Sequence, residues 1–331
     1  MRRVLAVSLA LGLVAAQTVP AHAYLKFGVR VDGRDVTLKW NRSVRYYVSD
    51  RGVPGVDPPA FQAALSRAFA TWEAVPSASI AYEFGGYTSA LPGEDDGRST
   101  LGFVEEPDLD RVLAATGFLI DASTGELLES DVFFNSIFPW SAASGEAGRF
   151  DLESIAVHEI GHLSGLGHSA LGETEAAESG HRRVIAAEAV MFPIAFSAGN
   201  MSGRRLKADD IAGISDIYPD GGFGSETGTI SGRVTKDGQG VFGAHIVAFN
   251  PATGAMIGNF SLDARGRFSI AGLAPGPHVL RVEPLDDADV ESFFDPEPPV
   301  DIDLRAAFFN RLVSAPRGGD SGAIDVSVVG K

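Results

Sequence analysis

The sequence predicts an α+β fold in which a domain of mixed strands and helices precedes a small all-β domain. Apolar residues recur at helical spacing in three separate stretches before residue 219. Strand-like segments lie between these stretches, and after residue 229 only short strands and turns remain. With 331 residues, of which 45% are hydrophobic and 21% charged, the chain is long enough for two such domains.

Residues 1–23 have the pattern of a signal peptide. Arg2 and Arg3 form a positive start, Val4 to Ala16 an apolar core, and Ala21-His22-Ala23 a small-x-small cleavage site. An uncleaved membrane anchor is the alternative, but the apolar run is short for a bilayer. The two arginines leave both the general and the twin-arginine export routes open. We therefore expect a secreted, extracellular protein with no membrane span after signal cleavage.

The net charge and the cysteine content indicate which binding partners and which stabilising bonds this protein can have. The formal net charge is −16, so nucleic acid and anionic membrane surfaces should repel the protein, and solubility is the simplest role for this charge. There is no cysteine, so no disulfide can stabilise the exported chain. We expect a monomer with no nucleic-acid partner.

The first elements follow from local patterns. Val36 to Trp40 and Val44 to Val48 have strand composition, and Asp57 followed by Pro58 predicts the start of a helix. The apolar stripe of this helix is Phe61, Ala64, Leu65, Ala68, Phe69 and Trp72. Further strands are predicted at Ser79 to Phe84, Thr100 to Glu105, Val112 to Ile120 and Glu126 to Asn135. The last two should form a hairpin across the turn-rich residues 121–125.

The stretch from His158 to His168 carries the chemistry. On a helix starting after the N-cap candidate Asp151, His158 and His162 lie one turn apart on the same face. Both imidazoles can therefore reach one metal ion, with Glu159 beside it, directed toward a bound water. Gly165 allows the positive φ that ends a helix, so the chain can return His168 as a third ligand. This pattern predicts a zinc site.

Three neutral imidazoles leave one zinc position open, as in catalytic sites. Two alternatives are a structural zinc, which would need a fourth protein ligand from elsewhere in the fold, and histidines that only satisfy core hydrogen bonds. This stretch of the sequence contains no fourth protein ligand, which favours the catalytic interpretation.

The H-E-x-x-H-x-x-G-x-x-H spacing resembles that of the metzincin zinc proteases. Met191-Phe192-Pro193, Ser169 after the third histidine, and the run from Lys207 to Ile214 resemble the matrixin branch. The resemblance extends from about Trp40 to Pro219. It implies a metzincin-type catalytic domain over residues 24–219, with a mixed twisted sheet and three main helices.

The resemblance also implies a function. The metal ligands would be His158, His162 and His168, with Glu159 as the general base and acid of a zinc-dependent endopeptidase and Met191 beneath the metal. An extended protein or peptide substrate would add as a strand to an edge strand near Ala115 to Ile120. From the sequence alone, that segment is equally compatible with an ordinary strand of the sheet.

Several family features are not expected here. Without cysteine there is no cysteine switch, and without a histidine from Tyr24 to Val157 we expect no second, histidine-bound zinc. Calcium sites are conceivable because acids such as Asp131 are available, but no ligands can be assigned. An insertion, Glu173 to Arg183, contains His181, for which we expect a solvated loop. Ile194-Ala195 follows Met-x-Pro where matrixins usually have a tyrosine one residue further on, which leaves the substrate pocket unpredicted.

The remainder begins with a predicted closing helix, Asp209 to Tyr218, and a glycine-rich linker at residues 220–228. Residues 229–331 then alternate short strands with turns, which predicts a small β-sandwich and a tail. Gly266-Arg267-Phe268 and Gly272-Leu273-Ala274-Pro275-Gly276 resemble a carboxypeptidase regulatory-like domain. A spacer or stabilising module is the simpler role for it, and a substrate- or surface-binding module is the other.

A rival function comes from a different class. The chain could be a non-catalytic surface or adhesion protein that binds through the β-sandwich while the zinc domain is inert. The retained Glu159 favours the protease, since an inert domain does not need that carboxylate.

Overall fold

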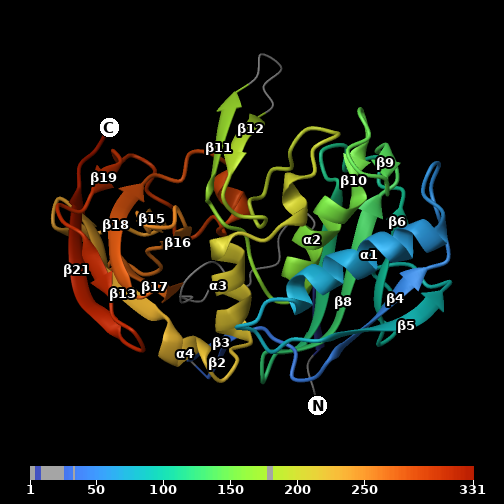
Figure 1. The fold of residues 1–331 in the computed structure, drawn as a ribbon, viewed down its shortest axis with the longest axis horizontal. Helices are drawn as coiled ribbons and strands as arrows, with labels where there is room; N and C mark the ends of the chain where they lie inside the picture. Colours follow the sequence, from blue (N-terminus) through green and yellow to red (C-terminus); the bar gives the residue numbers. More distant parts are fainter. Residues whose placement is uncertain (1–3, 9–25, 33, 177–181) are drawn as a thin grey trace.

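The computed structural model describes residues 4–8, 26–32, 34–176 and 182–331. Figure 1 shows two neighbouring units, with the α+β unit on the right and the β-rich unit on the left. The α+β class predicted from the sequence is confirmed. The predicted signal peptide lies outside the described residues except for Val4–Ser8, which forms strand β1.

The α+β unit is built on a six-stranded mixed sheet with the order β1-β7-β8-β6-β4-β5. The bounds of its other strands are Val44–Ser49 (β4), Tyr82–Thr88 (β5), Ser99–Val104 (β6), Ala114–Asp121 (β7) and Glu126–Asn135 (β8). Strands β7 and β8 form the predicted antiparallel hairpin. Strand β7 is not outermost here, because β1 pairs with it in an antiparallel register from Val4 opposite Asp121 to Ser8 opposite Gly117.

Two boundaries differ from the sequence prediction. Val36 and Thr37 belong to β3 (Arg34–Thr37), which pairs with β2 (Gly28–Val31) in a separate hairpin outside the main sheet. Strand β5 begins at Tyr82 and continues to Thr88, because Tyr87 and Thr88 extend its parallel ladder with β4.

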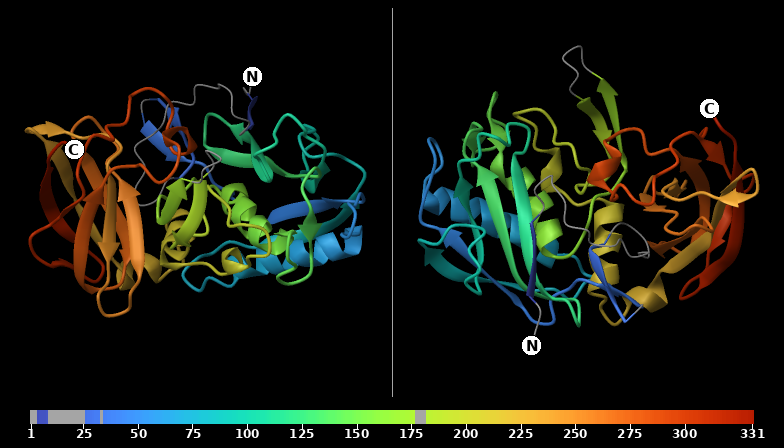
Figure 2. Two further views of the ribbon diagram at one scale, coloured as in Figure 1. Left: turned by 90° about the horizontal axis from the view of Figure 1, so that it is seen from above. Right: turned by 180° about the vertical axis from the view of Figure 1, so that it is seen from behind.

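Two helices cover the same face of the sheet (Figures 1 and 2). Helix α1 (Pro58–Glu73) begins as predicted, with the carboxylate of Asp57 accepting a hydrogen bond from the Ala60 N–H at 2.8 Å. Its predicted stripe is buried, from Phe61 to Trp72. The Trp72 indole donates to the Val157 carbonyl of helix α2 at 2.8 Å, which fixes the two helices relative to each other.

Helix α2 (Leu152–Leu163) carries the histidine motif and has a firmly held first turn. The Asp151 carboxylate accepts a hydrogen bond from the Ser154 N–H at 2.9 Å, as expected for an N-cap. It also forms an ion pair with Arg204, with 2.5 Å between nitrogen and oxygen. The carboxylate therefore joins the helix start to the turn η1 (Ser202–Arg204). Short strands β9 (Trp140–Ser141) and β10 (Phe150–Asp151) precede the helix.

The insertion after the third histidine forms a β-hairpin rather than a loop without regular structure. Its strands are β11 (Gly172–Ala176) and β12 (Arg182–Ala187), and His181 lies outside the described residues. Figure 1 shows this hairpin projecting between the two units. Helix α3 (Ala208–Ile217), predicted as the closing helix, also lies at this boundary, and α4 (Phe223–Glu226) follows with Phe223 buried.

The β-rich unit consists of two facing sheets. One contains β14 (Gln239–Gly240), β13 (Gly228–Lys236), β17 (Arg267–Leu273) and β21 (Asp320–Val328). The other contains β16 (Met256–Phe260), β15 (His245–Phe249), β18 (Gly276–Glu283), β19 (Ala307–Phe308) and β20 (Val313–Ala315). A turn η2 (Val290–Ser292) lies in the connection after β18.

The two units share their apolar packing. The side chain of Asp209 on α3 accepts the Gly258 N–H of β16 at 2.8 Å. Gly272 of β17, at a φ of 74°, has no room for a side chain, since a Cβ there would lie 2.7 Å from the Cβ of Ala212 on α3. The backbone of β17 thus lies directly against helix α3.

Candidate metal centre

Three histidines predicted from the sequence converge in the structure. One ring nitrogen from each of His158, His162 and His168 lies within 4.8 Å of the others. Helix α2 supplies the first two, one turn apart. Gly165, with a φ of 101°, turns the chain after the helix so that His168 returns to them. Among the described residues, no other group of three or more histidines and carboxylates converges in this way.

Each of the three rings makes one hydrogen bond to a backbone carbonyl through Nδ1. His158 bonds to Val190 at 2.8 Å, His162 to Leu166 at 2.8 Å, and His168 to Ser292 at 2.6 Å. A carbonyl oxygen only accepts, so Nδ1 carries the proton in each neutral ring and the lone pair is on Nε2. Three lone pairs therefore face a common point.

This arrangement fits a zinc ion. The Nε2 atoms of His162 and His168 are 3.1 Å apart, although neither has a proton to share with the other. Two nitrogens bound to a tetrahedral zinc at about 2.0–2.1 Å would be separated by about 3.3 Å. Without a cation the two lone pairs repel each other. A cation between the two nitrogens would be coordinated by both lone pairs. His162 is buried, while His158 and His168 are half-buried, so two of the three candidate ligands are partly exposed.

Burial keeps the three imidazoles neutral. It lowers the pKa of His158, lowers that of His162 well below its usual value, and lowers that of His168 to about 3. The proximity of the rings lowers the pKa values of His162 and His168 further, whereas the hydrogen bonds to the carbonyls act in the opposite direction. Neutral rings are what metal coordination requires.

Glu159 is buried beside this group and is oriented by strand β7. Its Oε2 accepts a hydrogen bond from the Thr116 hydroxyl at 2.7 Å, which leaves Oε1 free to accept a proton. Burial raises the pKa of Glu159 to about 7, and the hydrogen bond from Thr116 opposes that rise. The carboxyl group can therefore exchange a proton near neutral pH, as a general base and acid must.

Met191 lies against the inner side of helix α2. A Cβ at Gly161 would come within 2.3 Å of the Met191 sulfur and 2.9 Å of the Trp72 ring. The carboxylate of Asp210 holds the backbone of this turn by accepting the N–H groups of Val190 and Met191 at 2.9–3.1 Å. Because Val190 also accepts from His158, Asp210 is connected to a histidine of the centre through one residue.

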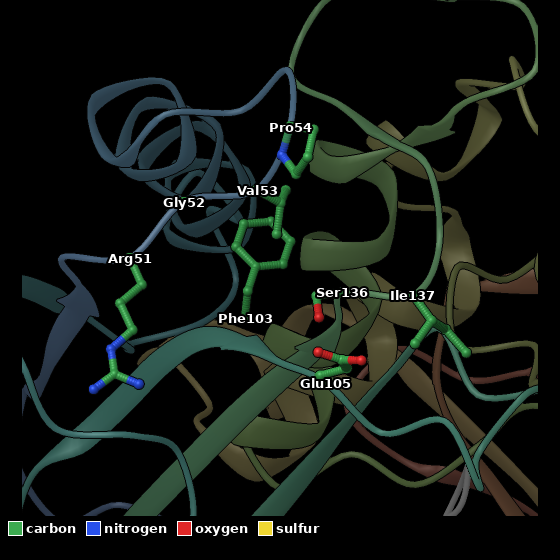
Figure 3. Close-up of a pocket in the computed structure, with 8 residues that line it drawn as sticks. All are labelled: Arg51, Gly52, Val53, Pro54, Phe103, Glu105, Ser136 and Ile137. Carbon is green, nitrogen blue, oxygen red and sulfur yellow. The ribbon is translucent and has the colours of Figure 1, made fainter.

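Two other places in the α+β unit have features of a site. Asp131 accepts the N–H groups of Gly93 and Thr100 at 2.6 and 2.7 Å, so its oxygens are used by the backbone, and calcium has no support. A hollow of about 440 Å³ lies at the carboxyl ends of β4, β6 and β8 (Figure 3). Arg51, Phe103 and Glu105 are among its lining residues, but none of the three histidines is. Neither place adds to the metal centre.

Comparison with known protein families agrees with this geometry. The family model for Matrixin matches residues 39–219, which include the three histidines, Glu159 and Met191. The chain belongs to the matrixin family. Matrixins are metalloendopeptidases that use zinc. A second model, for the carboxypeptidase regulatory-like domain, matches residues 229–292. Both resemblances inferred from the sequence are confirmed.

The chain is similar to proteins from a plant and from mammals. Metalloendoproteinase 5-MMP of Arabidopsis thaliana is 40% identical over 87 residues, covering 24% of this chain and 19% of the relative. Matrix metalloproteinase-16 of Rattus norvegicus is 28% identical over 197 residues, covering 58% of this chain and 30% of the relative. The Homo sapiens protein of that name is 28% identical over 183 residues, covering 54% and 27%. This matrixin thus spans a third or less of these relatives.

Sequence reasoning missed two contributors to the centre. Thr116 is one of many hydroxyl residues in strands, and only its distance to Glu159 gives it a role. The Ser292 carbonyl is a backbone group 124 residues from His168, so no sequence signal could have identified it.

Proposed function

We propose that this matrixin is a secreted zinc endopeptidase that hydrolyses peptide bonds in extended protein substrates. The observation that carries the proposal is the convergence of ring nitrogens from three histidines next to the buried carboxyl group of Glu159. Export is supported by the pattern of residues 1–23. In the described part of the chain, no helix is both long and apolar enough to cross a bilayer.

In this mechanism His158, His162 and His168 hold the metal through Nε2. When bound, zinc would lower the pKa of a water molecule and polarise the carbonyl group of the substrate. Glu159 accepts a proton from the attacking water at Oε1 and passes it to the leaving amine. Thr116 holds Oε2 throughout, so that the free oxygen keeps its direction. Met191 packs beneath the centre without contributing a ligand.

The substrate would bind along β7. The pairing of Val4–Ser8 supports this, since the outer edge of β7 accepts an extended antiparallel strand there. A peptide in that position would lie beside Thr116, the residue that contacts Glu159. Backbone hydrogen bonds of this kind tolerate many side-chain sequences. We therefore expect an unfolded protein to serve as a general substrate.

Cleavage of a reduced, unfolded protein by wild type, Glu159→Gln and Glu73→Gln tests the proposal. Glu73 is exposed at the end of α1 and provides the matched control. We expect cleavage by wild type and Glu73→Gln, loss of cleavage in Glu159→Gln, and inhibition by a zinc chelator that added zinc reverses. If Glu159→Gln cleaves as fast as wild type, or if the chelator has no effect, the protease assignment is wrong. The non-catalytic surface or adhesion protein would then be the better explanation.

A further inference from the structure

The carbonyl groups that orient the three histidines come from two different units of the protein. Val190 and Leu166 belong to the α+β unit, as do the histidines that they orient. Ser292 lies in the turn η2, in the connection after β18 of the β-rich unit. One of the three ring orientations therefore depends on how the units are packed together.

Such a hydrogen bond matters to a metal site. The acceptor at Nδ1 fixes which nitrogen carries the proton and which direction the lone pair of the other nitrogen takes. Loss of an acceptor of this kind typically weakens metal binding by about 10- to 100-fold. The ring of Phe293 also packs edge-on against His168, with 6.2 Å between the centroids. The Ser292 carbonyl thus keeps the proton of this imidazole on Nδ1, and Phe293 limits the tilt of the ring.

Residues 285–294, which we call the docking segment, are anchored to both units. Towards the α+β unit, the Asp287 side chain accepts the Thr174 N–H at 2.9 Å and its carbonyl accepts the Thr174 hydroxyl at 2.7 Å. Thr174 lies in β11, the insertion hairpin that follows His168. The insertion therefore has a structural partner, because its first strand binds the docking segment.

Towards the β-rich unit, the docking segment is held by aromatic packing. Phe294 contacts Phe260 of β16 and Phe242, with ring centroids 5.1 and 5.2 Å apart. The same apolar cluster includes Ala170 and Phe192 of the α+β unit. Residues before and after Ser292 are therefore held by contacts with both units.

We propose that the β-rich unit completes the metal centre: the docking segment positions His168 through the Ser292 carbonyl, so that zinc affinity depends on contacts between the units. The inference rests on the proposed function, because it takes the three histidines as zinc ligands. It assigns the β-rich unit a role beyond that of a spacer, with Ser292 and Phe293 as positioning residues.

The test measures zinc affinity in the full-length protein by competition with a chromogenic chelator. The test variant combines Thr174→Val with Phe293→Ala, which removes the ring against His168. Thr174→Val removes the hydroxyl that donates to the Asp287 carbonyl and accepts from Arg182. The control combines Thr235→Val with Phe308→Ala, both in the β-rich unit and outside the docking segment; Phe308 is 65% exposed. We expect zinc dissociation constants about 10- to 100-fold higher in the test variant. In the control they should stay within about twofold of wild type.

A second readout separates positioning from general loss of structure. Nitrogen NMR of the zinc-free protein should show the His168 proton on Nδ1 in wild type and control, and a mixture of tautomers in the test variant. Circular dichroism establishes that each variant is folded. If the double variant does not fold, Thr174→Val alone, which keeps the apolar cluster, should weaken zinc binding by about threefold or more.

The outcomes distinguish the two proposals. Unchanged zinc affinity in a folded test variant, or in folded Thr174→Val when the double variant does not fold, would overturn the role of the docking segment while leaving the protease intact. Absence of zinc binding in wild type would overturn both.

Discussion

Replacing Gly161 with alanine should destabilise this protein although alanine is the better helix former. The new Cβ would lie 2.3 Å from the Met191 sulfur and 2.9 Å from Trp72, where unstrained contacts need about 3.5–4.0 Å. Both neighbours are at most 2% exposed, and Trp72 is fixed by its hydrogen bond to Val157. Overpacking of this kind costs about 1–3 kcal/mol, and the gain in helix propensity returns about 1 kcal/mol. The difference is a net loss of up to about 2 kcal/mol.

Urea unfolding of the zinc-free protein would measure this loss. Gly224→Ala is the matched control, because a Cβ there meets nothing within 4 Å, and its stability should stay within about 0.5 kcal/mol of wild type. The cause is tested by a double-mutant cycle with Met191→Ala, in which the penalty at Gly161 should fall to the part that Trp72 causes. A Gly161→Ala protein as stable as wild type, or a penalty that is just as large without Met191, would refute the proposed packing beneath the metal centre.

Two further predictions concern protonation. Thr116→Val removes the hydrogen bond that lowers the pKa of Glu159, so the acidic limb of the kcat/KM profile should move to higher pH. At pH 6 the activity should be about tenfold lower than that of wild type. An unchanged pH profile would contradict this role of Thr116. Burial lowers the pKa of His168, so the stabilisation from its neutral ring is complete above the unfolded value of about 6.5 and is lost as pH falls toward 3. Urea unfolding of the zinc-free proteins should therefore show that wild type loses stability relative to His168→Leu as the pH falls through this range. If the free energies of unfolding of the two proteins change with pH in parallel, this role of His168 is excluded.

The parts of the structure predicted well are those specified by neighbouring residues. Asp57 and Pro58 start α1 because an N-cap acceptor and a residue without an N–H suit a helix start, whatever lies around it. The histidine positions follow likewise from the helical repeat and from the positive φ of Gly165. In each case the chemistry and the geometry come from residues close together in the chain.

The parts that could not be predicted depend on contacts between distant segments. The insertion is charged enough to be taken for a solvated loop, yet β11 pairs with β12 and also binds Asp287 of the other unit. Thr116 and Ser292 owe their roles to groups that every protein contains in abundance, a hydroxyl and a backbone carbonyl. Only the tertiary structure brings them to Glu159 and His168.

The central claim is that three histidines hold one zinc ion, which works together with Glu159. The most direct measurement is a titration of the chelator-stripped protein with zinc while peptide cleavage is followed. The account predicts that activity rises to a plateau at one zinc per chain, and that Glu159→Gln binds the same single zinc without gaining activity. Activity in the absence of zinc, or equal activity in Glu159→Gln, would contradict it.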